Sequence, residues 1–417
     1  MNALPGVYSN ETMTVEGDIL PSRVVIPAGV SLVATGTPEE TVILGERDGT
    51  IASGIGSGAI RCVRFESTAE SRVSGFTLTG GATCPSSAVD VDKCGSAVYG
   101  MSHSSSIVEN CIVSNNVAYL GTGSKCCFRR CRIVGNRATY RGAAGQNCDF
   151  VSCLINGNDG DNQVDYAYRF ESSTIGPDVA PSDTIALTNP RDSLTVLNSL
   201  VLGGKQHSNI KARNSAFVKG NGVKDENLTD CIVTNAAALV VDENFVPVVG
   251  RNVAIDRGNS ARYSFADNGE TDLAGNPRIM NGAMDIGCFE ADWKPVYSKI
   301  LGRGVMVTAA SSNVVAEVGG KSVKVPAGQV LALDWTRELK GEEVEFRYRT
   351  AVTGEGALSV TVDGGEPKTV TATDDPQQSF RSADESHTLS FAFDAGVDGY
   401  AELSKFTVPF GLLLMVR

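Results

Sequence analysis

One structural position recurs along the middle of the chain at a fixed phase. Successive copies stand 35, 20, 22, 20, 26, 16 and 16 residues apart, and they are Phe76, Cys111, Cys131, Cys153, Ser173, Ser199, Ser215 and Cys231. Two residues after each copy comes a large apolar side chain, in the series Leu78, Val113, Ile133, Ile155, Ile175, Val201, Phe217 and Val233. A repeat of this length buries its apolar face only against its neighbours. The pattern therefore predicts a parallel β-solenoid whose strands stack about 4.8 Å apart.

Each copy also carries a signal for a tight corner. Three residues after the apolar side chain, most copies have a residue that tolerates a left-handed backbone, namely Gly81, Asn116, Asn136, Asn158, Gly204 or Gly220. We therefore expect each copy to be a short strand that ends in a corner.

The cysteines fit the same repeat. Four of the eleven cysteines share the repeat position with serines, which is where a small and weakly polar core residue fits. This placement predicts a ladder of buried thiols. It leaves a disulfide open for two further pairs, Cys84 with Cys94 and Cys126 with Cys148.

The chain of 417 residues is expected to have three parts. Residues 1–60 contain short β-branched runs and are expected to form irregular coils that cap the solenoid. Residues 61–293 hold the repeats and a closing segment. Residues 294–417 contain longer alternating runs, so an antiparallel β-sandwich of jelly-roll type is expected there.

Bulk charge limits the partners. A net charge of −12 argues against nucleic acid and against an anionic membrane surface. No apolar run is long enough to span a membrane. No signal peptide follows Met1, so the start is expected to be a trimmed one. We expect a secreted or cell-surface protein, but the N-terminus itself does not indicate it.

A resemblance to a known group comes from two segments. Residues 271–279, followed by residues 285–290, resemble the closing signature of the bacterial right-handed parallel β-helix proteins called choice-of-anchor proteins, and residues 76–81 are similar to their recurring coil. The resemblance covers about residues 5–290 and implies a right-handed β-helix. That fold hosts lyases, hydrolases, adhesins and binding modules. In size and architecture the chain also resembles the β-helix carbohydrate-binding modules that accompany gut bacterial xylanases.

Catalytic carboxylates are not paired on the outward face next to the repeat position. Glu109 and Glu171 are three coils apart, about 14 Å, whereas glycoside hydrolysis needs two carboxyl groups about 5 to 9.5 Å apart. Arg129, Arg130 and Arg132 form a basic cluster on the same face. This cluster is read either as the base of a lyase or as a solvated surface balanced by the two glutamates.

Tyrosines recur near the coil period and offer a candidate binding surface. Tyr99, Tyr119, Tyr140, and then Tyr166 with Tyr168, follow one another at 20, 21 and 26 to 28 residues. Rings at one phase on successive coils predict a column that presents successive π-faces to successive sugar rings. The alternative is an aromatic ladder that fills the solenoid interior.

Oxygen-rich turns raise the question of a cation. Asp159, Asp161 and Asp165 have a spacing that would suit Ca²⁺, although the rest of an EF-hand loop is missing. The alternative is an ordinary polar turn. No cofactor is otherwise required.

These patterns lead to one functional prediction with two alternatives. The chain is predicted to be a non-catalytic carbohydrate-binding module for a plant cell-wall polysaccharide, in particular xylan, with the five tyrosines, Arg129 and Arg132 as ligand-binding residues. The expected partners are the polysaccharide and a catalytic glycoside hydrolase domain in the full-length protein. The alternatives are a β-helix polysaccharide lyase or glycoside hydrolase, and a surface adhesin or spacer.

Overall fold

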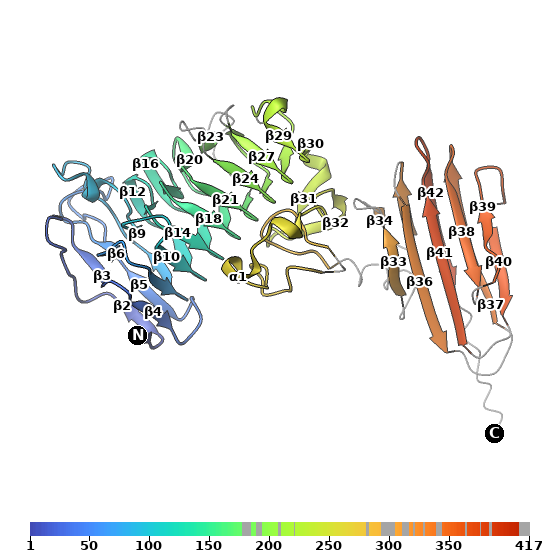
Figure 1. The fold of residues 1–417 in the computed structure, drawn as a ribbon, viewed down its shortest axis with the longest axis horizontal. Helices are drawn as coiled ribbons and strands as arrows, with labels where there is room; N and C mark the ends of the chain where they lie inside the picture. The colour runs from blue at the N-terminus through green and yellow to red at the C-terminus, as the bar shows by residue number, and fades with distance from the viewer. Residues whose placement is uncertain are drawn as a thin grey trace, which may run out of the picture. The chain divides into compact units, whose positions relative to one another are not determined.

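The structure is a computed structural model of the 417-residue chain. It describes residues 1–176, 185–188, 194–206, 210–220, 222–280 and 283–292. Between 305 and 407 it describes all residues except 311–316, 320–321, 328–329, 339–343, 363–364, 376 and 383–385. The described chain is almost entirely β-structure (Figure 1).

Residues 1–234 form three long parallel sheets, and the chain adds a strand to each sheet in turn as it winds (Figure 1). Sheet A has the strand order β1 (Asn2–Ala3), β4 (Ser31–Ala34), β7 (Ser71–Ser74), β10 (Ser106–Glu109), β14 (Cys127–Arg129), β18 (Asp149–Val151), β21 (Arg169–Glu171), β24 (Thr195–Leu197), β27 (Lys211–Arg213) and β29 (Leu228–Thr229). Sheet B has the order β2 (Gly6–Tyr8), β5 (Thr41–Leu44), β8 (Thr77–Thr79), β11 (Ile112–Ser114), β15 (Arg132–Val134), β19 (Leu154–Asn156), β22 (Thr174–Ile175), β25 (Leu200–Val201), β28 (Ala216–Val218) and β30 (Ile232–Thr234). Sheet C has the order β3 (Ser22–Ile26), β6 (Arg61–Phe65), β9 (Val98–Tyr99), β13 (Gly123–Ser124), β17 (Gly145–Gln146), β20 (Asn162–Asp165), β23 (Ile185–Thr188) and β26 (Lys205–Gln206).

This arrangement is consistent with the predicted parallel β-helix, in which each coil contributes one strand to each sheet. The apolar series of the repeat lies in register along sheet B, for example Val113 opposite Ile133 and Ile133 opposite Ile155. These three side chains are 0% exposed. The sequence therefore predicts both the strands and their register correctly, while the handedness of the coil remains a prediction.

A single left-handed residue turns the chain from sheet A into sheet B in most coils. This residue precedes the repeat position, and the set with positive φ is Gly75, Asn110, Arg130, Ser152, Ser172, Asn198, Asn214 and Asp230. Asparagine and glycine suit this conformation, and one such residue per coil keeps the corner short.

The corner after sheet B differs from the prediction. The left-handed residues of that corner are Gly80, Asn115, Gly135 and Gly157, one position earlier than expected, although Gly204 and Gly220 do have positive φ as predicted. The expected residues Asn116, Asn136 and Asn158 are instead buried and bonded to one another along the axis. Asn116 Nδ2 donates to Asn136 Oδ1 at 2.9 Å, and Asn136 Nδ2 donates to Asn158 Oδ1 at 3.0 Å. Asparagine is used here for its amide, which donates to one coil and accepts from the other.

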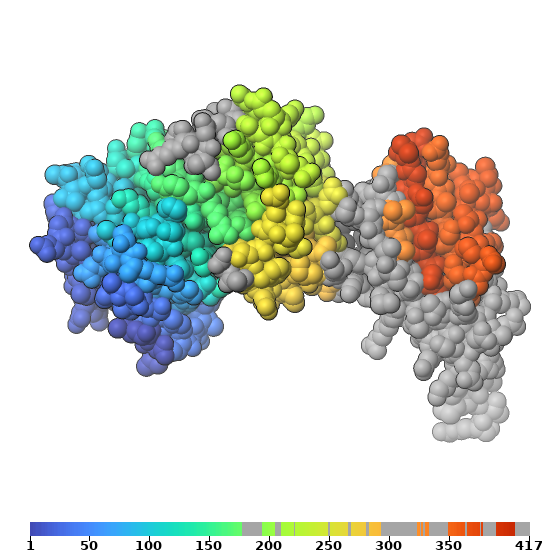
Figure 2. All heavy atoms as spheres, viewed as in Figure 1, coloured from blue at the N-terminus to red at the C-terminus, as the bar shows by residue number. Residues whose placement is uncertain are grey.

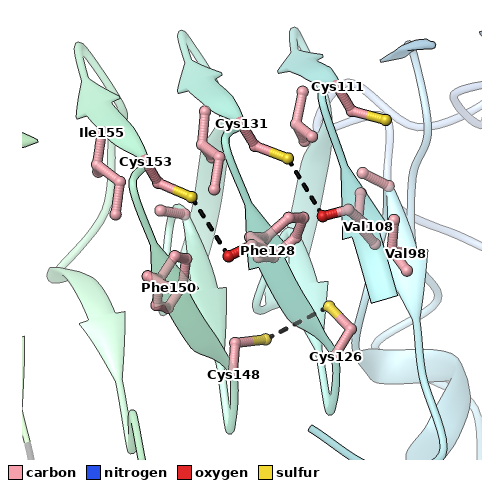
Figure 3. Packing of buried hydrophobic residues seen from close by; sticks show 14 of the residues in the cluster. Val98, Val108, Cys111, Cys126, Phe128, Cys131, Cys148, Phe150, Cys153 and Ile155 are labelled. Atoms are coloured by element: carbon pink, nitrogen blue, oxygen red, sulfur yellow. Dashed lines mark hydrogen bonds between the residues drawn. The ribbon is translucent and has the colours of Figure 1, made fainter. Parts of the chain in front are cut away.

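The interior contains ladders of identical side chains (Figure 3). The thiols of Cys131 and Cys153 each donate to a carbonyl oxygen of the preceding coil at 3.4 Å, as the predicted thiol ladder requires. Beside them, Phe128 and Phe150 stack with ring centroids 5.5 Å apart. All of the cysteines are free thiols, with the Sγ atoms of Cys126 and Cys148 3.6 Å apart, so neither of the disulfides left open is formed.

The N-terminal residues 1–60 belong to the same three sheets as the repeats, because they supply β1 to β5. The chain divides into two compact units. The first comprises residues 1–236, 258–278 and 284–290, and the second comprises residues 237–257, 279–283 and 291–417. The predicted boundary between residues 293 and 294 lies outside the described residues, and the three-part division remains a prediction.

The C-terminal region has antiparallel strands where alternation predicts them. One sheet has the order β33 (Val305–Ala310), β36 (Val330–Glu338), β41 (Ser386–Asp394), β38 (Ala357–Val362) and β39 (Lys368–Val370), and the other has β34 (Glu317–Gly319), β35 (Ser322–Pro326), β42 (Tyr400–Thr407), β37 (Val344–Thr353) and β40 (Gln377–Ser382). Alternate side chains of these strands, such as Leu389, Phe391 and Phe393, are at most 1% exposed. The jelly-roll connection remains a prediction.

Within the described residues, no helix has the length and apolar character needed to cross a membrane.

Candidate functional site

Two of the five predicted tyrosines form a stacked pair on neighbouring coils. Tyr119 lies in β12 (Val117–Leu120) and Tyr140 in β16 (Arg137–Arg141), two strands that pair in parallel after the sheet B corner. Their ring centroids are 5.5 Å apart and the ring planes differ by 18°. Tyr140 is 39% exposed, and Tyr119 is half-buried. These rings line up along the axis, and they do not fill the interior.

The ring faces of Tyr119 and Tyr140 are not free to stack on sugar rings, although the sequence predicts that they are. Because the rings are stacked, one face of each is turned to the other ring. Tyr119 also packs against an apolar cluster that includes Ile55 and Cys84. The Arg141 guanidinium lies over the Tyr140 ring, with its Cζ 4.7 Å from the centroid. The expectation of successive free π-faces is therefore wrong, since stacking along the axis leaves ring edges and hydroxyls for a ligand.

The hydroxyls of the pair remain open to a ligand. Within the part of the chain that the structure describes, the phenol groups of Tyr119 and Tyr140 make no hydrogen bond, and neither is a buried unsatisfied atom. A phenol both donates and accepts, as does a sugar hydroxyl. The pair thus places two hydroxyl-bearing edges about one coil, or about 4.8 Å, apart.

A short insertion forms one side of the tyrosine pair. It contains the 3-10 helix η1 (Asp90–Lys93), and Cys94 pairs with Leu120 of β12. Lys93 Nζ lies 2.8 Å from Asp90 Oδ1. The hydrogen bond to Asp90 raises the pKa of Lys93, and the electrostatic interaction with Tyr119 raises it further. A charged amine therefore stands beside the Tyr119 end of the stack.

Arg61 fixes this insertion from within. Its guanidinium is buried and donates to the carbonyl oxygens of Val91, Cys94 and Gly95 at 2.8, 2.9 and 2.7 Å. Burial lowers the pKa of Arg61 to about 10, so the side chain is still charged at neutral pH. Three bonds to backbone carbonyls hold the insertion in one conformation.

Asp92 anchors the insertion from its other side. Its carboxylate accepts hydrogen bonds from the backbone amides of Ile19 and Leu20 and from the Ser87 hydroxyl. The insertion is therefore tied both to the first coil and to itself.

Tyr99 is not part of the column. It lies in β9 of sheet C, in register with Ser124, and is only 7% exposed. Three cations lie over its ring, with Arg61, Arg64 and Lys125 at 5.3, 4.7 and 5.5 Å from the centroid. The Tyr99 ring therefore makes cation–π contacts with these side chains and is not exposed to a ligand.

Tyr166 and Tyr168 occupy a third location. Both lie between β20 and β21, and Tyr166 is itself the left-handed residue of that corner, with φ 54°. Tyr168 stacks on His103 with centroids 3.9 Å apart. Tyr99, Tyr166 and Tyr168 therefore lie apart from the stacked pair, which corrects the expectation of a single column. The cause is local, because these tyrosines belong to sheet C or its corner, whereas Tyr119 and Tyr140 follow sheet B.

The predicted arginine cluster is engaged by a later part of the chain. Residues 258–278 and 284–290 return along the outer face of the coils, and their yellow atoms cover part of the green coils in Figure 2. The short helix α1 (Phe265–Asn268) of this segment ends next to Glu171 of β21 (Figure 1). Arg130 donates to Glu109 Oε1 and to the Asn268 carbonyl oxygen, each at 2.7 Å. Arg132 lies over the Phe289 ring at 5.3 Å. Arg129 lies in β14, in register with Glu109 and half-buried.

The glutamates of this face are engaged as well. Glu109 also pairs with Arg72 at 2.8 Å. Glu171 accepts from Asn268 Nδ2 at 2.9 Å and pairs with Arg169 at 2.6 Å. These groups hold the returning segment on the coils. The two readings of the cluster, a lyase base or a solvated surface, both overlooked this segment.

The three predicted calcium ligands are not brought together. Asp159 is exposed and faces Arg137, with 3.5 Å between Oδ2 and Nε. Asp161 is exposed, whereas Asp165 is 2% exposed in β20 and accepts from Gln146 Nε2 at 3.2 Å. Among the described residues, no three His, Cys, Asp or Glu side chains are grouped so that they could hold a metal ion.

No protein-family model and no curated protein sequence matches the chain. The solved structures to which it is similar include the secreted serine protease VesC from Vibrio cholerae, with 16% identity and a TM-score of 0.23 over 28% of this chain and 27% of that chain. This chain therefore spans little more than a quarter of the protease's length.

Two further solved structures are similar to the chain. The carbohydrate-binding module TmCBM61, solved with β-1,4-galactotriose, has 13% identity and a TM-score of 0.18 over 26% of this chain and 82% of that chain. The enzymatically active domain of tailspike protein 4 from bacteriophage CBA120 has 12% identity and a TM-score of 0.18 over 91% of this chain and 60% of that chain. At these TM-scores the likenesses decide nothing about function.

Sequence reasoning missed Arg141, Lys93 and Arg61. Arg141 had a usable signal, since it directly follows Tyr140 in a strand whose other polar residues face outward. The positions of Lys93 and Arg61 depend on how the insertion folds back, which no periodicity reports.

Proposed function

We propose that this protein binds a polysaccharide through the outer wall of its coils, at the stacked pair of Tyr119 and Tyr140. The observation that carries the proposal is the pair itself. Two tyrosines on neighbouring coils keep their edges and hydroxyls toward solvent, while the stacked phenylalanines of the same coils are buried. Repeated hydroxyl-bearing edges along the axis suit a polymer of repeated sugar units.

The binding mode follows from the orientation of the rings. A sugar chain that lies along the coil axis meets ring edges, so its contacts are hydrogen bonds to the phenol groups and edge packing on the rings. The flanking cations Lys93 and Arg141 extend the polar surface at the two ends of the pair.

We further propose that the protein is a secreted or cell-surface, non-catalytic module and that its ligand is a plant cell-wall polysaccharide such as xylan. It would act beside a glycoside hydrolase domain of the full-length protein. The body would be a right-handed β-helix, the sense that nearly all parallel crossover connections adopt, and the C-terminal sheets a jelly-roll sandwich.

The test is affinity electrophoresis of the full chain through gels that contain single soluble polysaccharides. The wild-type protein should be retarded by at least one of them. Tyr119→Ala and Tyr140→Ala should each weaken retardation about tenfold, the loss expected for removing one ring with its hydrogen bond. Tyr8→Ala is the matched control, since Tyr8 is 38% exposed and lies outside the pair.

Two results would overturn the proposal. One is normal migration of the wild-type protein in every polysaccharide gel. The other is retardation that survives both substitutions in the pair, because the ligand would then bind elsewhere. Circular dichroism of each variant separates loss of binding from loss of fold.

A further inference from the structure

Arg141 stands apart from most arginines of the coils in how its side chain is used. The guanidinium groups of Arg61 and Arg130 donate their N–H groups to backbone carbonyls or to a carboxylate. The guanidinium of Arg141 lies over the Tyr140 ring and makes no hydrogen bond or ion pair with any described residue. Its face is therefore supported while its donors remain free.

The position of this guanidinium is fixed by the stack. Tyr140 stacks on Tyr119, and Cζ of Arg141 lies 4.7 Å from the centroid of the Tyr140 ring. The guanidinium is therefore held beside the tyrosine pair by a cation–π contact. A guanidinium held in this way loses less side-chain entropy when it binds a ligand, and its planar fork of N–H donors is already formed.

Of the three cations beside the tyrosine pair, Lys93, Arg137 and Arg141, only Arg141 has no carboxylate partner among the described residues. Arg137, on the same strand, faces Asp159 of the next coil at 3.5 Å. Lys93, at the Tyr119 end, is paired with Asp90 at 2.8 Å. Asp161 is exposed on the next coil and makes no ion pair with Arg141 among the described residues.

We propose that the polysaccharide carries carboxylates, and that Arg141 is the residue that recognises them. The planar fork of a guanidinium matches the two oxygens of a carboxylate, and such charge-assisted, paired hydrogen bonds are about twice as strong as neutral ones. The ligand class is therefore a glycan with uronic acid units, whose carboxylate lies beside Tyr140 while neighbouring sugar hydroxyls meet the phenol groups. This inference rests on the proposed function and narrows its ligand.

The experiment compares one polysaccharide with and without its carboxylates. The full chain is run through gels that contain glucuronoxylan, and through gels that contain the same glucuronoxylan after its carboxyl groups have been reduced to alcohols. The variants are Arg141→Ala, Arg141→Lys and the control Arg213→Ala, an exposed arginine of β27 far along the coils.

The proposal expects the wild-type protein to bind glucuronoxylan about tenfold more tightly than the reduced polymer, the effect of one charge-assisted contact. Arg141→Ala should remove this difference between the two polymers. Arg141→Lys should keep part of the difference, because it retains the charge and loses the fork. Arg213→Ala should behave as wild type.

The other outcomes separate this inference from the proposed function. If both polymers bind equally well and Tyr140→Ala abolishes both, the polysaccharide site stands and the assignment of a carboxylate is wrong. If Arg141→Ala retains the full preference, the carboxylate binds at another residue and the proposal fails. If neither polymer retards the protein and no other acidic polysaccharide does, both the site and its ligand class are overturned.

Discussion

Two stacks of aromatic rings on the same coils have nearly the same geometry and opposite surroundings. Phe128 and Phe150 stand 5.5 Å apart with 22° between their planes, and Tyr119 and Tyr140 stand 5.5 Å apart with 18°. The phenylalanines are 0% exposed, whereas Tyr140 is 39% exposed. The register of the coils therefore sets the stacking geometry, and burial decides whether a stack supports the fold or faces a ligand.

This comparison also explains why stacking is a poor indicator of sugar binding in a solenoid. Neighbouring coils are about 4.8 Å apart along the axis, so rings at one phase tend to cover each other's faces. What distinguishes the outer stack is its exposed edges, its hydroxyls and the guanidinium at its end. The interior stack has apolar surface alone.

The largest expected effect comes from breaking the inner stack. Phe150→Ala removes a buried ring that lies between Phe128 and Phe170, and a cavity should remain because both neighbours are fixed by their strands. We expect the free energy of unfolding of the coil unit to fall by about 3 to 5 kcal/mol. Urea denaturation followed by circular dichroism measures it. A fall below about 1 kcal/mol would mean that the interior repacks and that the inner stack is not a fixed ladder.

A second large effect is expected for the asparagine ladder, which belongs to the interior like the phenylalanines. Asn136→Ala removes the buried acceptor of the Asn116 backbone amide, together with the side-chain bonds to Asn116 and Asn158. The loss of these buried hydrogen bonds, with one backbone amide left unsatisfied, should cost about 2 to 3 kcal/mol of unfolding free energy. Asn115→Gly is the control, because Asn115 is exposed and left-handed and glycine tolerates that backbone. Equal stability of the two variants would contradict this account.

The third prediction concerns an interior thiol and alkaline pH. Burial raises the pKa of Cys62 from its ordinary value of 9.0 to about 12. The unfolded thiol ionises first, so the stability contributed by this group is complete below pH 9.0 and is lost as pH rises toward about 12. The loss in this window is about 1.4 kcal/mol per pH unit.

Cys62→Ala provides the comparison for that prediction. Between about pH 8 and about pH 10.5, the unfolding free energy of the wild-type protein should fall by on the order of 2 kcal/mol more than that of the variant. Urea titrations at the two pH values measure the difference. Parallel curves for both proteins would show that the thiol is not held in its neutral form.

The smallest effect on stability is expected in the outer stack. Tyr140→Ala removes a ring that is 39% exposed, so the unfolding free energy should fall by about 1 kcal/mol or less. The same variant should weaken polysaccharide retardation about tenfold, whereas the interior variants that still fold should leave it unchanged. Thermal unfolding and affinity electrophoresis on one preparation test both parts. A loss of stability as large as that of Phe150→Ala would make the outer stack structural.

The coil arrangement could be predicted because its cause is local and repeated. The series from Leu78 to Phe217 fixes strand, face and register together, since a strand shifted by one residue would turn this series outward. Val233, in the last coil that the structure describes, is 42% exposed because no further coil covers it. The thiol ladder follows from the same phase. In the coils with Asn116, Asn136 and Asn158 the left-handed residue was predicted one position too late, because asparagine suits both a left-handed backbone and a buried amide ladder. Residue type alone does not separate these two uses.

The candidate site was only half predictable. The pairing of Tyr119 with Tyr140 follows from their spacing and the coil period. The spacing of Tyr99, Tyr166 and Tyr168 fits the same period, but those residues belong to other strands, and period alone does not say which sheet a residue joins. The covering of Arg130 by Asn268 joins positions 138 residues apart, and no repeat encodes such a contact.

The corner from sheet A into sheet B has a further consequence for how such a chain can change. Coils of 16 to 35 residues all contain the same one-residue bend, and neighbouring coils are in register there. The additional residues of a long coil therefore lie at its other corners. New loops can thus be gained or lost at the other corners of a coil without displacing the layers above and below. The η1 insertion beside Tyr119 is one such addition, which makes the wall that carries it a natural place for ligand preference to diverge among proteins built on this plan.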